Sequence, residues 1–274
     1  MTGPVQSPWP GEPEEVDLRP GLCSVTFRQL DVDRVIAAAV AAGLEGIEWG
    51  GDVHVPNGDR DRAREVAARC RDAGIGCPSY GSYLMAGASS PEDAVAAVDT
   101  CRALGASNLR VWTVWGVGPD ADDTERRRVA EDLRVIADRA AAAGLTVSLE
   151  FHPGTLTATA ESTVRLLGEV DRANLYTYWQ PEPGAEPAAA LAEYAAVAAD
   201  CSHLHVFWWA ADGTRLPLAA GEPVWRRVLG DDSERRWFGE RWAFLEFVAG
   251  DDPAVLVREA EVLRRLVAEA GARR

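Results

Sequence analysis

The chain has 274 residues, 47% of them apolar, and a formal net charge of -15, so it can bury the core of one large domain or of two ordinary ones. This negative charge opposes binding to the phosphate backbone of a nucleic acid and to an anionic membrane surface. All 28 basic residues are arginine, which excludes Schiff-base aldolases, pyridoxal phosphate enzymes and P-loop proteins, because each of these needs a lysine amine.

The N-terminal segment is rich in proline and acidic residues and lacks apolar periodicity, so we expect a poorly ordered arm over residues 1–20. It shows neither the basic start nor the apolar block of a signal peptide. No later apolar run approaches the roughly 20 residues that a membrane span needs. The five cysteines are widely spread and form no C-x-x-C pair, which predicts reduced thiols and a cytoplasmic protein.

From residue 21 onward one unit recurs: a short apolar strand, a polar loop, an alanine-rich amphipathic helix, and a glycine before the next strand. Helix starts are indicated by Asp31, Ser90, Pro187 and Asp252, which are residue types favoured at or beside a helix N-terminus. Strands are predicted over residues 22–25, 46–49, 75–80, 108–112, 146–150, 175–179, 203–207 and 243–247.

Strands that alternate with helices over a chain of this length predict a single (β/α)8 TIM barrel over residues 21–274. An open, doubly wound sheet is disfavoured because no G-x-G-x-x-G motif follows the first strand. In such a barrel the chemistry lies at the carboxyl ends of the strands, whose loops share one mouth. Polar residues at predicted strand ends are therefore candidate site residues.

The fifth predicted strand ends in Glu150, and His152 lies in the turn that follows. An ionised carboxylate in a core costs several kcal/mol unless it is paired or bound to a cation. Glu150 therefore needs a partner. One possible partner is a cation; the alternative is an ion pair inside the barrel, for instance with Arg110.

Other strand ends add Glu48, Asp52 and His54 from the second unit, Gln180 from the sixth, His203 and His205 from the seventh, and Glu246 from the eighth. Carboxylates, an imidazole and an amide oxygen form a mixed oxygen and nitrogen set, which suits one divalent cation. We favour Mn²⁺ and keep Mg²⁺, Co²⁺ and Zn²⁺ as alternatives. For His205 the alternative is a hydrogen-bonded core histidine.

Aromatic residues also gather at or just beyond the predicted strand ends, where flat rings can stack on a sugar or pack beneath loops. The residues that we expect to contact substrate, beyond the metal ligands, are Glu48, Trp49, His54, Trp112, His152 and Trp179. For Trp49 and His54, in the segment WGGDVHVP, a purely structural loop remains the alternative.

Four short segments in this order carry a family resemblance: Glu150 in LEFHPGTLT, His205 in HLHVF, Arg215 in GTRLPLAAG and Glu246 in FLEFV. Together they resemble the sugar phosphate isomerase/epimerase family of xylose isomerase-like TIM barrels, over nearly the whole chain after the arm. The resemblance implies that one divalent metal is held by Glu150, Gln180, His205 and Glu246, and that Arg215 contacts the substrate.

Gln180, in the segment YWQP, departs from the family, which usually has an aspartate at this position. A glutamine oxygen can coordinate a hard cation but brings no negative charge. The site should therefore bind metal more weakly or rely on another acid. The candidates for that acid are Asp52, Glu48 and Glu182.

The resemblance implies an isomerase or epimerase of a small sugar or polyol ketone or aldehyde, in which Glu150 and Glu246 pass a proton through an enediolate. One alternative is a dehydratase or other lyase, which would expel a β-hydroxyl from a related polyhydroxy substrate. The other is a sugar-binding barrel that has lost its metal through Gln180. The expected partner is a small carbohydrate, neither nucleic acid nor membrane, and assembly into a homo-oligomer stays open.

Overall fold

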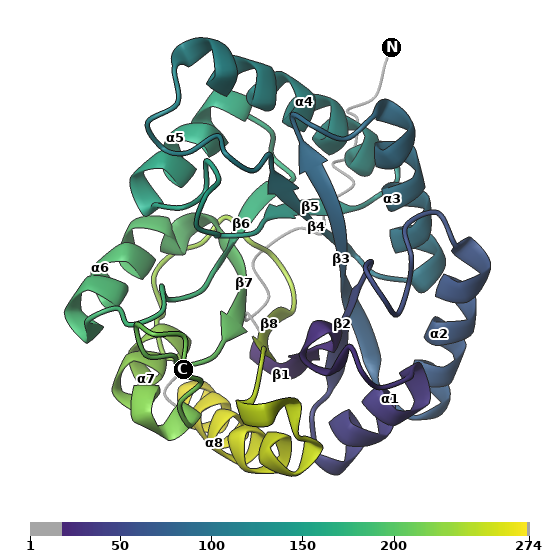
Figure 1. Ribbon diagram of the computed structural model, residues 1–274, viewed down its shortest axis with the longest axis vertical. Helices are drawn as coiled ribbons and strands as arrows, with labels where there is room; N and C mark the ends of the chain where they lie inside the picture. The colour runs from purple at the N-terminus through teal and green to yellow at the C-terminus, as the bar shows by residue number, and fades with distance from the viewer. Residues whose placement is uncertain (1–17, 273–274) are drawn as a thin grey trace, which may run out of the picture.

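The computed structural model describes residues 18–272, in which eight parallel strands close into a barrel in the order β1-β2-β3-β4-β5-β6-β7-β8. Helices alternate with the strands and form a ring around them, as Figure 1 shows in a view into the barrel. This confirms the predicted (β/α)8 barrel. The expected arm lies outside the described residues up to position 17, whereas residues 18–20 already belong to the first strand.

The strands are β1 (Leu18–Cys23), β2 (Gly46–Gly50), β3 (Gly76–Ala86), β4 (Asn108–Thr113), β5 (Thr146–Leu149), β6 (Leu175–Trp179), β7 (Cys201–Val206) and β8 (Arg241–Leu245). The α-helices are α1 (Val32–Ala41), α2 (Arg60–Asp72), α3 (Pro91–Leu104), α4 (Asp123–Ala142), α5 (Ala160–Val170), α6 (Pro187–Val197), α7 (Glu222–Leu229) and α8 (Pro253–Gly271). Short 3-10 helices cover Ser24–Phe27, Ala198–Asp200, Leu218–Gly221 and Ala249–Asp251.

Helix N-termini form where the capping residues predicted them. The Asp31 carboxylate accepts a hydrogen bond from the backbone N–H of Arg34, and Asp252 caps α8 in the same way. Ser90 and Asp93 form a reciprocal capping box at the start of α3. Each cap satisfies backbone N–H groups that have no partner within the helix, which fixes where each helix leaves the barrel.

The barrel interior contains a hydrogen-bonded polar layer below the site. The Asn108 amide oxygen accepts a hydrogen bond from Ser148 Oγ at 2.8 Å, and Ser148 Oγ lies 2.8 Å from Ser202 Oγ. The Tyr178 hydroxyl lies 3.2 Å from the Asn108 amide nitrogen. Buried polar groups that satisfy one another hold their side chains in defined positions, so this layer supports the charged groups above it.

Strand β3 continues six residues beyond the predicted end at Tyr80, and its last residues, Gly81 to Ala86, reach the rim of the barrel. Its register against β4 shifts between Gly81 and Met85, and Tyr83 in this interval has φ +57°, a left-handed conformation that costs free energy for any residue with a side chain. The irregularity directs Tyr83 toward the mouth of the barrel.

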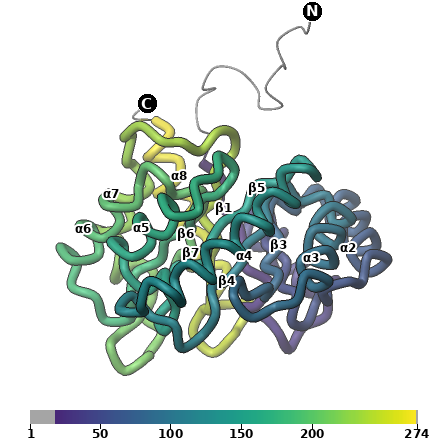
Figure 2. Tube along the Cα trace, turned by 90° about the horizontal axis from the view of Figure 1, so that it is seen from above, coloured from purple at the N-terminus to yellow at the C-terminus, as the bar shows by residue number. Residues whose placement is uncertain are grey.

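A view turned by 90° places α2 and α3 on one side of the barrel and α6 and α7 on the opposite side (Figure 2). The helix ring therefore covers the barrel all round, and α8 packs beside β1 where the ring closes. Among the described residues, no helix combines the length and apolar character that crossing a membrane would require.

Candidate active site

A cavity of about 370 Å³ opens at the carboxyl ends of the strands, where a TIM barrel carries its chemistry. Its wall is largely aromatic and is formed by Tyr83, Trp112, Phe207, Trp209 and Phe247. Its floor carries charged and polar groups, namely Arg110, Glu150, Gln180 and Glu246. An apolar wall over a few convergent polar groups is the usual construction of a small-molecule site.

Glu150 lies directly after β5 and is 4% exposed. Its Oε2 atom accepts from the Arg110 guanidinium and from the Trp112 indole N–H. Arg110 and Trp112 both lie on β4 and, being two residues apart, point to the same face of the sheet. The ion pair with Arg110 foreseen as the alternative partner of Glu150 is thus present, and Oε1 is the oxygen left to face a cation.

His205 on β7 is fully buried beneath the cavity floor. Its Nδ1 atom lies 2.8 Å from the Gln180 amide oxygen and 3.6 Å from Glu246 Oε2. Ligand atoms of Glu150, His205 and Glu246 all fall within 4.8 Å of one another. The structure therefore brings together all four residues that the resemblance names as metal ligands.

Glu48 on β2 lies below this cluster and is 1% exposed, so it has no surface to present to a substrate. Its Oε1 lies 2.9 Å from Arg110 Nε, in an ion pair, and 3.2 Å from His205 Nε2. Its Oε2 accepts from the Tyr178 hydroxyl at 2.7 Å and from Ser79 Oγ at 2.8 Å. Burial alone would raise the pKa of Glu48, but Arg110, His205 and Tyr178 hold it well below its usual range.

The net negative charge of this cluster matches the charge of one divalent cation. When ionised, the carboxylates of Glu48, Glu150 and Glu246 exceed the one guanidinium of Arg110 by two negative charges, in a region that water barely reaches. A buried excess of this kind is unfavourable unless a cation offsets it. The donors are carboxylate, amide and imidazole atoms, which suits Mn²⁺, Mg²⁺, Co²⁺ or Zn²⁺. The residues present therefore fit a divalent metal.

His152 lines the cavity from the turn after β5. Its Nδ1 atom lies 2.9 Å from the Pro153 carbonyl oxygen, which can only accept, so Nδ1 carries the proton of the neutral ring. The ring packs against Trp112 and Trp115, with centroids 4.8 and 4.9 Å away. Desolvation lowers the pKa of His152, which favours the neutral ring and leaves Nε2 as an acceptor.

The mouth of the cavity is held by ion pairs between loops. Arg28 Nε lies 2.5 Å from Asp52 Oδ2, and Arg28 Nη2 donates to the Tyr83 hydroxyl at 2.6 Å. Arg215 pairs with Asp251 and lies over the ring of Phe247, with 5.0 Å to the centroid. Arg215 thus supports the aromatic wall from behind and does not itself line the cavity.

Three residues expected to contact substrate point away from the cavity. Trp49 and Trp179 are fully buried, and Trp179 packs on Tyr194 and Trp225 in the helix layer. His54 is 2% exposed, with its ring nitrogens 3.1 Å from Ser24 Oγ and 3.0 Å from the Leu30 carbonyl oxygen. Side chains alternate along a strand, so Glu48 and Gln180 face inward while their neighbours Trp49 and Trp179 face the helices.

The three acids proposed to compensate for Gln180 lie in different surroundings. Asp52 is engaged by Arg28 at the mouth, and Glu182 is exposed. Only Glu48 contacts a residue of the metal-ligand set, through His205. It is therefore the acid whose charge can reach the cluster at short range.

Several cavity residues carried no clear signal in the sequence. Arg28 follows a 3-10 helix after β1, and Phe247 follows the last strand with φ +54°. Neither position is distinguished by periodicity, because both depend on irregular backbone. Arg110 had a signal: it is an arginine within an apolar strand, a residue type that is almost never buried unless paired.

Known proteins resemble this chain in sequence and in fold. A 3-dehydroshikimate dehydratase of Bacillus anthracis is 26% identical over 88% of this chain and 95% of the relative. Among solved structures, a probable 3-DHS dehydratase from Bacillus anthracis superposes with a TM-score of 0.71 at 21% identity, covering 90% of this chain and 98% of the other. D-allulose 3-epimerase from Methylomonas sp. gives 0.62 at 16% identity, covering 92% and 99%.

At these identities the structural likeness shows the fold and no more. The family model described as a xylose isomerase-like TIM barrel matches residues 36–206, from α1 through β7. This range is more than half of the 274 residues and includes every proposed metal ligand except Glu246. The chain therefore belongs to the xylose isomerase-like TIM barrel family.

Proposed function

We propose that this protein is a divalent-metal-dependent dehydratase that removes water from a small, cyclic, hydroxylated keto acid. The observation that carries the proposal is the convergence of Glu150, His205 and Glu246 within 4.8 Å beneath an aromatic-walled cavity. A curated relative that is 26% identical is named a 3-dehydroshikimate dehydratase. That substrate is a cyclic hydroxylated keto acid, and its ring can pack against a cavity wall that includes Trp112 and Trp209.

The cation, when bound, would polarise the substrate carbonyl and so acidify the neighbouring C–H bond. Glu246 has no arginine partner among residues 18–272, and we assign it the removal of that proton. Glu150, held by Arg110 and Trp112, faces it as the second proton-transfer group. The C–O bond to the β-hydroxyl then breaks, and the departing hydroxide takes up the proton that Glu246 removed, passed on through Glu150, and leaves as water.

Other cavity residues would orient the substrate. His152 presents Nε2 as an acceptor for a substrate hydroxyl, because its Nδ1 proton is held by the Pro153 carbonyl. Arg28 and the Tyr83 hydroxyl at the mouth are the donors nearest to solvent for a substrate carboxylate. These contacts would fix which carbon lies beside Glu246.

A sugar epimerase is the second candidate, because the same pair of glutamates can remove and return a proton without loss of a hydroxyl. The likeness to D-allulose 3-epimerase supports it at the level of fold. The two functions differ in the product: dehydration lowers its mass by one water, whereas epimerisation conserves it. In deuterium oxide the epimerised product also gains deuterium from solvent.

The test is incubation of the Mn²⁺-loaded protein with 3-dehydroshikimate and, separately, with D-allulose, followed by mass spectrometry. We expect loss of water from the keto acid, and no turnover by Glu150→Gln or Glu246→Gln. Glu182→Gln is the matched control, because this exposed acid also follows β6 but lies outside the cavity, and it should keep full activity. Turnover retained in both glutamine variants, or a product of unchanged mass, would overturn the dehydratase.

A further inference from the structure

The imidazole of His205 is contacted on both ring nitrogens. On the cavity side, Nδ1 lies 2.8 Å from the Gln180 amide oxygen and 3.6 Å from Glu246 Oε2. On the opposite side, Nε2 lies 3.2 Å from Glu48 Oε1. A neutral imidazole has one N–H and one lone pair. One ring nitrogen must therefore donate and the other must accept, and one of the contacts must determine which nitrogen carries the proton.

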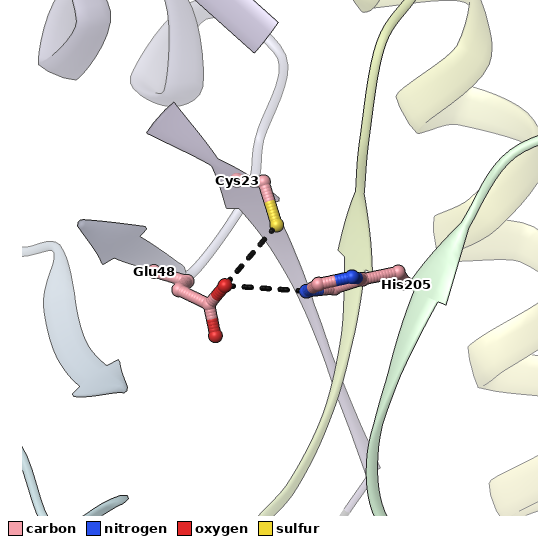
Figure 3. Close-up of side chains that lie close together, drawn as sticks. All are labelled: Cys23, Glu48 and His205. Carbon is pink, nitrogen blue, oxygen red and sulfur yellow. Dashed lines mark hydrogen bonds and ion pairs between the residues drawn. The ribbon is translucent and has the colours of Figure 1, made fainter. Parts of the chain in front are cut away.

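Glu48 is the neighbour that can fix which ring nitrogen of His205 carries the proton. Its Oε1 atom lies between the Cys23 thiol, at 3.6 Å, and the imidazole, as Figure 3 shows for the three side chains converging from β1, β2 and β7. The Arg110 guanidinium forms an ion pair with the same oxygen, with Nε 2.9 Å away. Each of these neighbours can act as a donor, and an ionised carboxylate can only accept. Nε2 must therefore carry its hydrogen.

The Gln180 side has no such constraint. Its amide can present either the oxygen or the NH₂ group to Nδ1 after a half-turn of the amide plane, so it adapts to the imidazole and does not dictate its proton. His205 Nδ1 and the Gln180 oxygen, 2.8 Å apart, can then both act as metal ligand atoms, beside the carboxylates of Glu150 and Glu246.

We propose that Glu48 is a positioning residue that holds the His205 proton on Nε2 and thereby keeps the Nδ1 lone pair directed at the cation site. The inference rests on the metal site of the proposed function. When one ring nitrogen of a histidine binds a metal, a carboxylate that accepts a hydrogen bond from the N–H of the other ring nitrogen makes the histidine a more basic ligand and fixes the orientation of its ring.

The same contacts argue against a second cation among Cys23, Glu48 and His205, although their ligand atoms also lie within 4.8 Å of one another. The Arg110 guanidinium already occupies Glu48 Oε1 and would repel a cation bound there. Burial, followed by the charges of Glu48 and Glu246, raises the pKa of the Cys23 thiol, so the soft thiolate ligand is suppressed. One equivalent of metal is therefore expected.

The first test reads the proton directly, in the metal-free protein. Nitrogen-15 NMR of histidine-labelled protein, with the His205 signals assigned by their loss in His205→Gln, should show Nε2 protonated and Nδ1 bearing the lone pair. A ring protonated on Nδ1, or on both nitrogens, would overturn the proposal. This readout needs no metal and no substrate, so it stands or falls separately from the dehydratase assignment.

The second test measures Mn²⁺ affinity and stoichiometry by calorimetry. Glu48→Met keeps the length of the side chain but removes the acceptor, and we expect affinity to fall about ten- to a hundred-fold. Glu48→Gln should keep most of the affinity, because its oxygen can still accept from His205 while its NH₂ donates to the hydroxyls of Ser79 and Tyr178. Cys23→Ser, which touches the same Glu48 oxygen, is the matched control and should bind like the wild type.

Unchanged affinity in Glu48→Met, or two equivalents of Mn²⁺ per wild-type chain, would contradict the assignment. If Glu48→Met does not fold, the NMR measurement on the wild type decides alone. If the wild type binds no Mn²⁺ at all, the metal-dependent function fails, while the NMR measurement still reports whether Glu48 sets the tautomer.

Discussion

Arg110 balances the buried acids of the barrel at the level of single residues. It is 3% exposed and pairs with Glu48 below and Glu150 above, so one guanidinium serves two carboxylates from different strands. Breaking a buried ion pair leaves an uncompensated charge in a region of low polarity, which costs far more than loss of a surface pair. The stability of the site therefore depends on this arginine.

Replacement of Arg110 by Met should lower the free energy of unfolding of the metal-free protein by about 3–5 kcal/mol, because it leaves Glu48 and Glu150 buried without their partner. Arg215→Met is the control: its pair with Asp251 is partly exposed, so its loss should cost about 0–1 kcal/mol. Denaturant unfolding of both variants checks the prediction, which equal losses would contradict.

Single-residue patterns in the sequence pointed to residues that the structure brings to one cavity, because a charged or polar residue at the end of an apolar strand is unusual and visible. Glu150, Gln180 and Glu246 all line the cavity, and His205 lies just beneath it. The partners of these groups were harder to place. The double pairing of Arg110 depends on which strands become neighbours across the barrel, and this is a property of the closed sheet.

At the scale of elements, caps and periodicity predicted where strands and helices lie, but not which way adjacent residues face. Glu48 and Trp49 are both polar or amphipathic residues at the end of β2, and either could face inward. Only the strand's setting in the barrel places Glu48 inside and Trp49 against the helix layer. The sequence also did not predict that β3 extends past Tyr80, because the residues around the register shift near Tyr83 show no alternating apolar pattern.

The contact between β6 and α6 gives this protein a pH-sensitive element. Glu193 on α6 is half-buried, and desolvation raises its pKa to about 7, a shift opposed by the nearby Trp179 indole and reinforced by the negative charge of Glu182. The carboxyl therefore stays protonated in the folded protein over a range in which it ionises in the unfolded chain. Its contribution to stability is full below its ordinary pKa near 4.5 and is lost as pH rises through about 7.

We therefore expect Glu193→Gln to stabilise the protein relative to the wild type more at pH 8 than at pH 5. The amide cannot ionise, so the variant escapes the cost of a charged, half-buried carboxylate at the higher pH. Thermal unfolding of the two proteins at both pH values measures the difference. Glu161→Gln on α5, where the side chain is exposed, serves as the control, and a Glu193→Gln effect independent of pH would contradict the prediction.

At the scale of the whole molecule, the repeated strand and helix unit was enough to predict the barrel, because eight such units have few other ways to bury their apolar faces. The proposed ligands come from positions at or just after β5, β6, β7 and β8, so one ion would join consecutive strands over half of the barrel. A cation held by the folded barrel and not by the unfolded chain must stabilise the entire fold.

Addition of Mn²⁺ at a hundred times its dissociation constant should raise the free energy of unfolding by about 2.7 kcal/mol, and EDTA should reverse the gain. Glu246→Gln removes a ligand charge from the last strand, so the stabilisation at the same Mn²⁺ concentration should largely disappear while unfolding stays cooperative. Denaturant titrations with and without metal provide the measurement. Equal stabilisation of both proteins would show that Mn²⁺ binds elsewhere on the acidic surface, and the cluster between β5 and β8 would then not be the metal site.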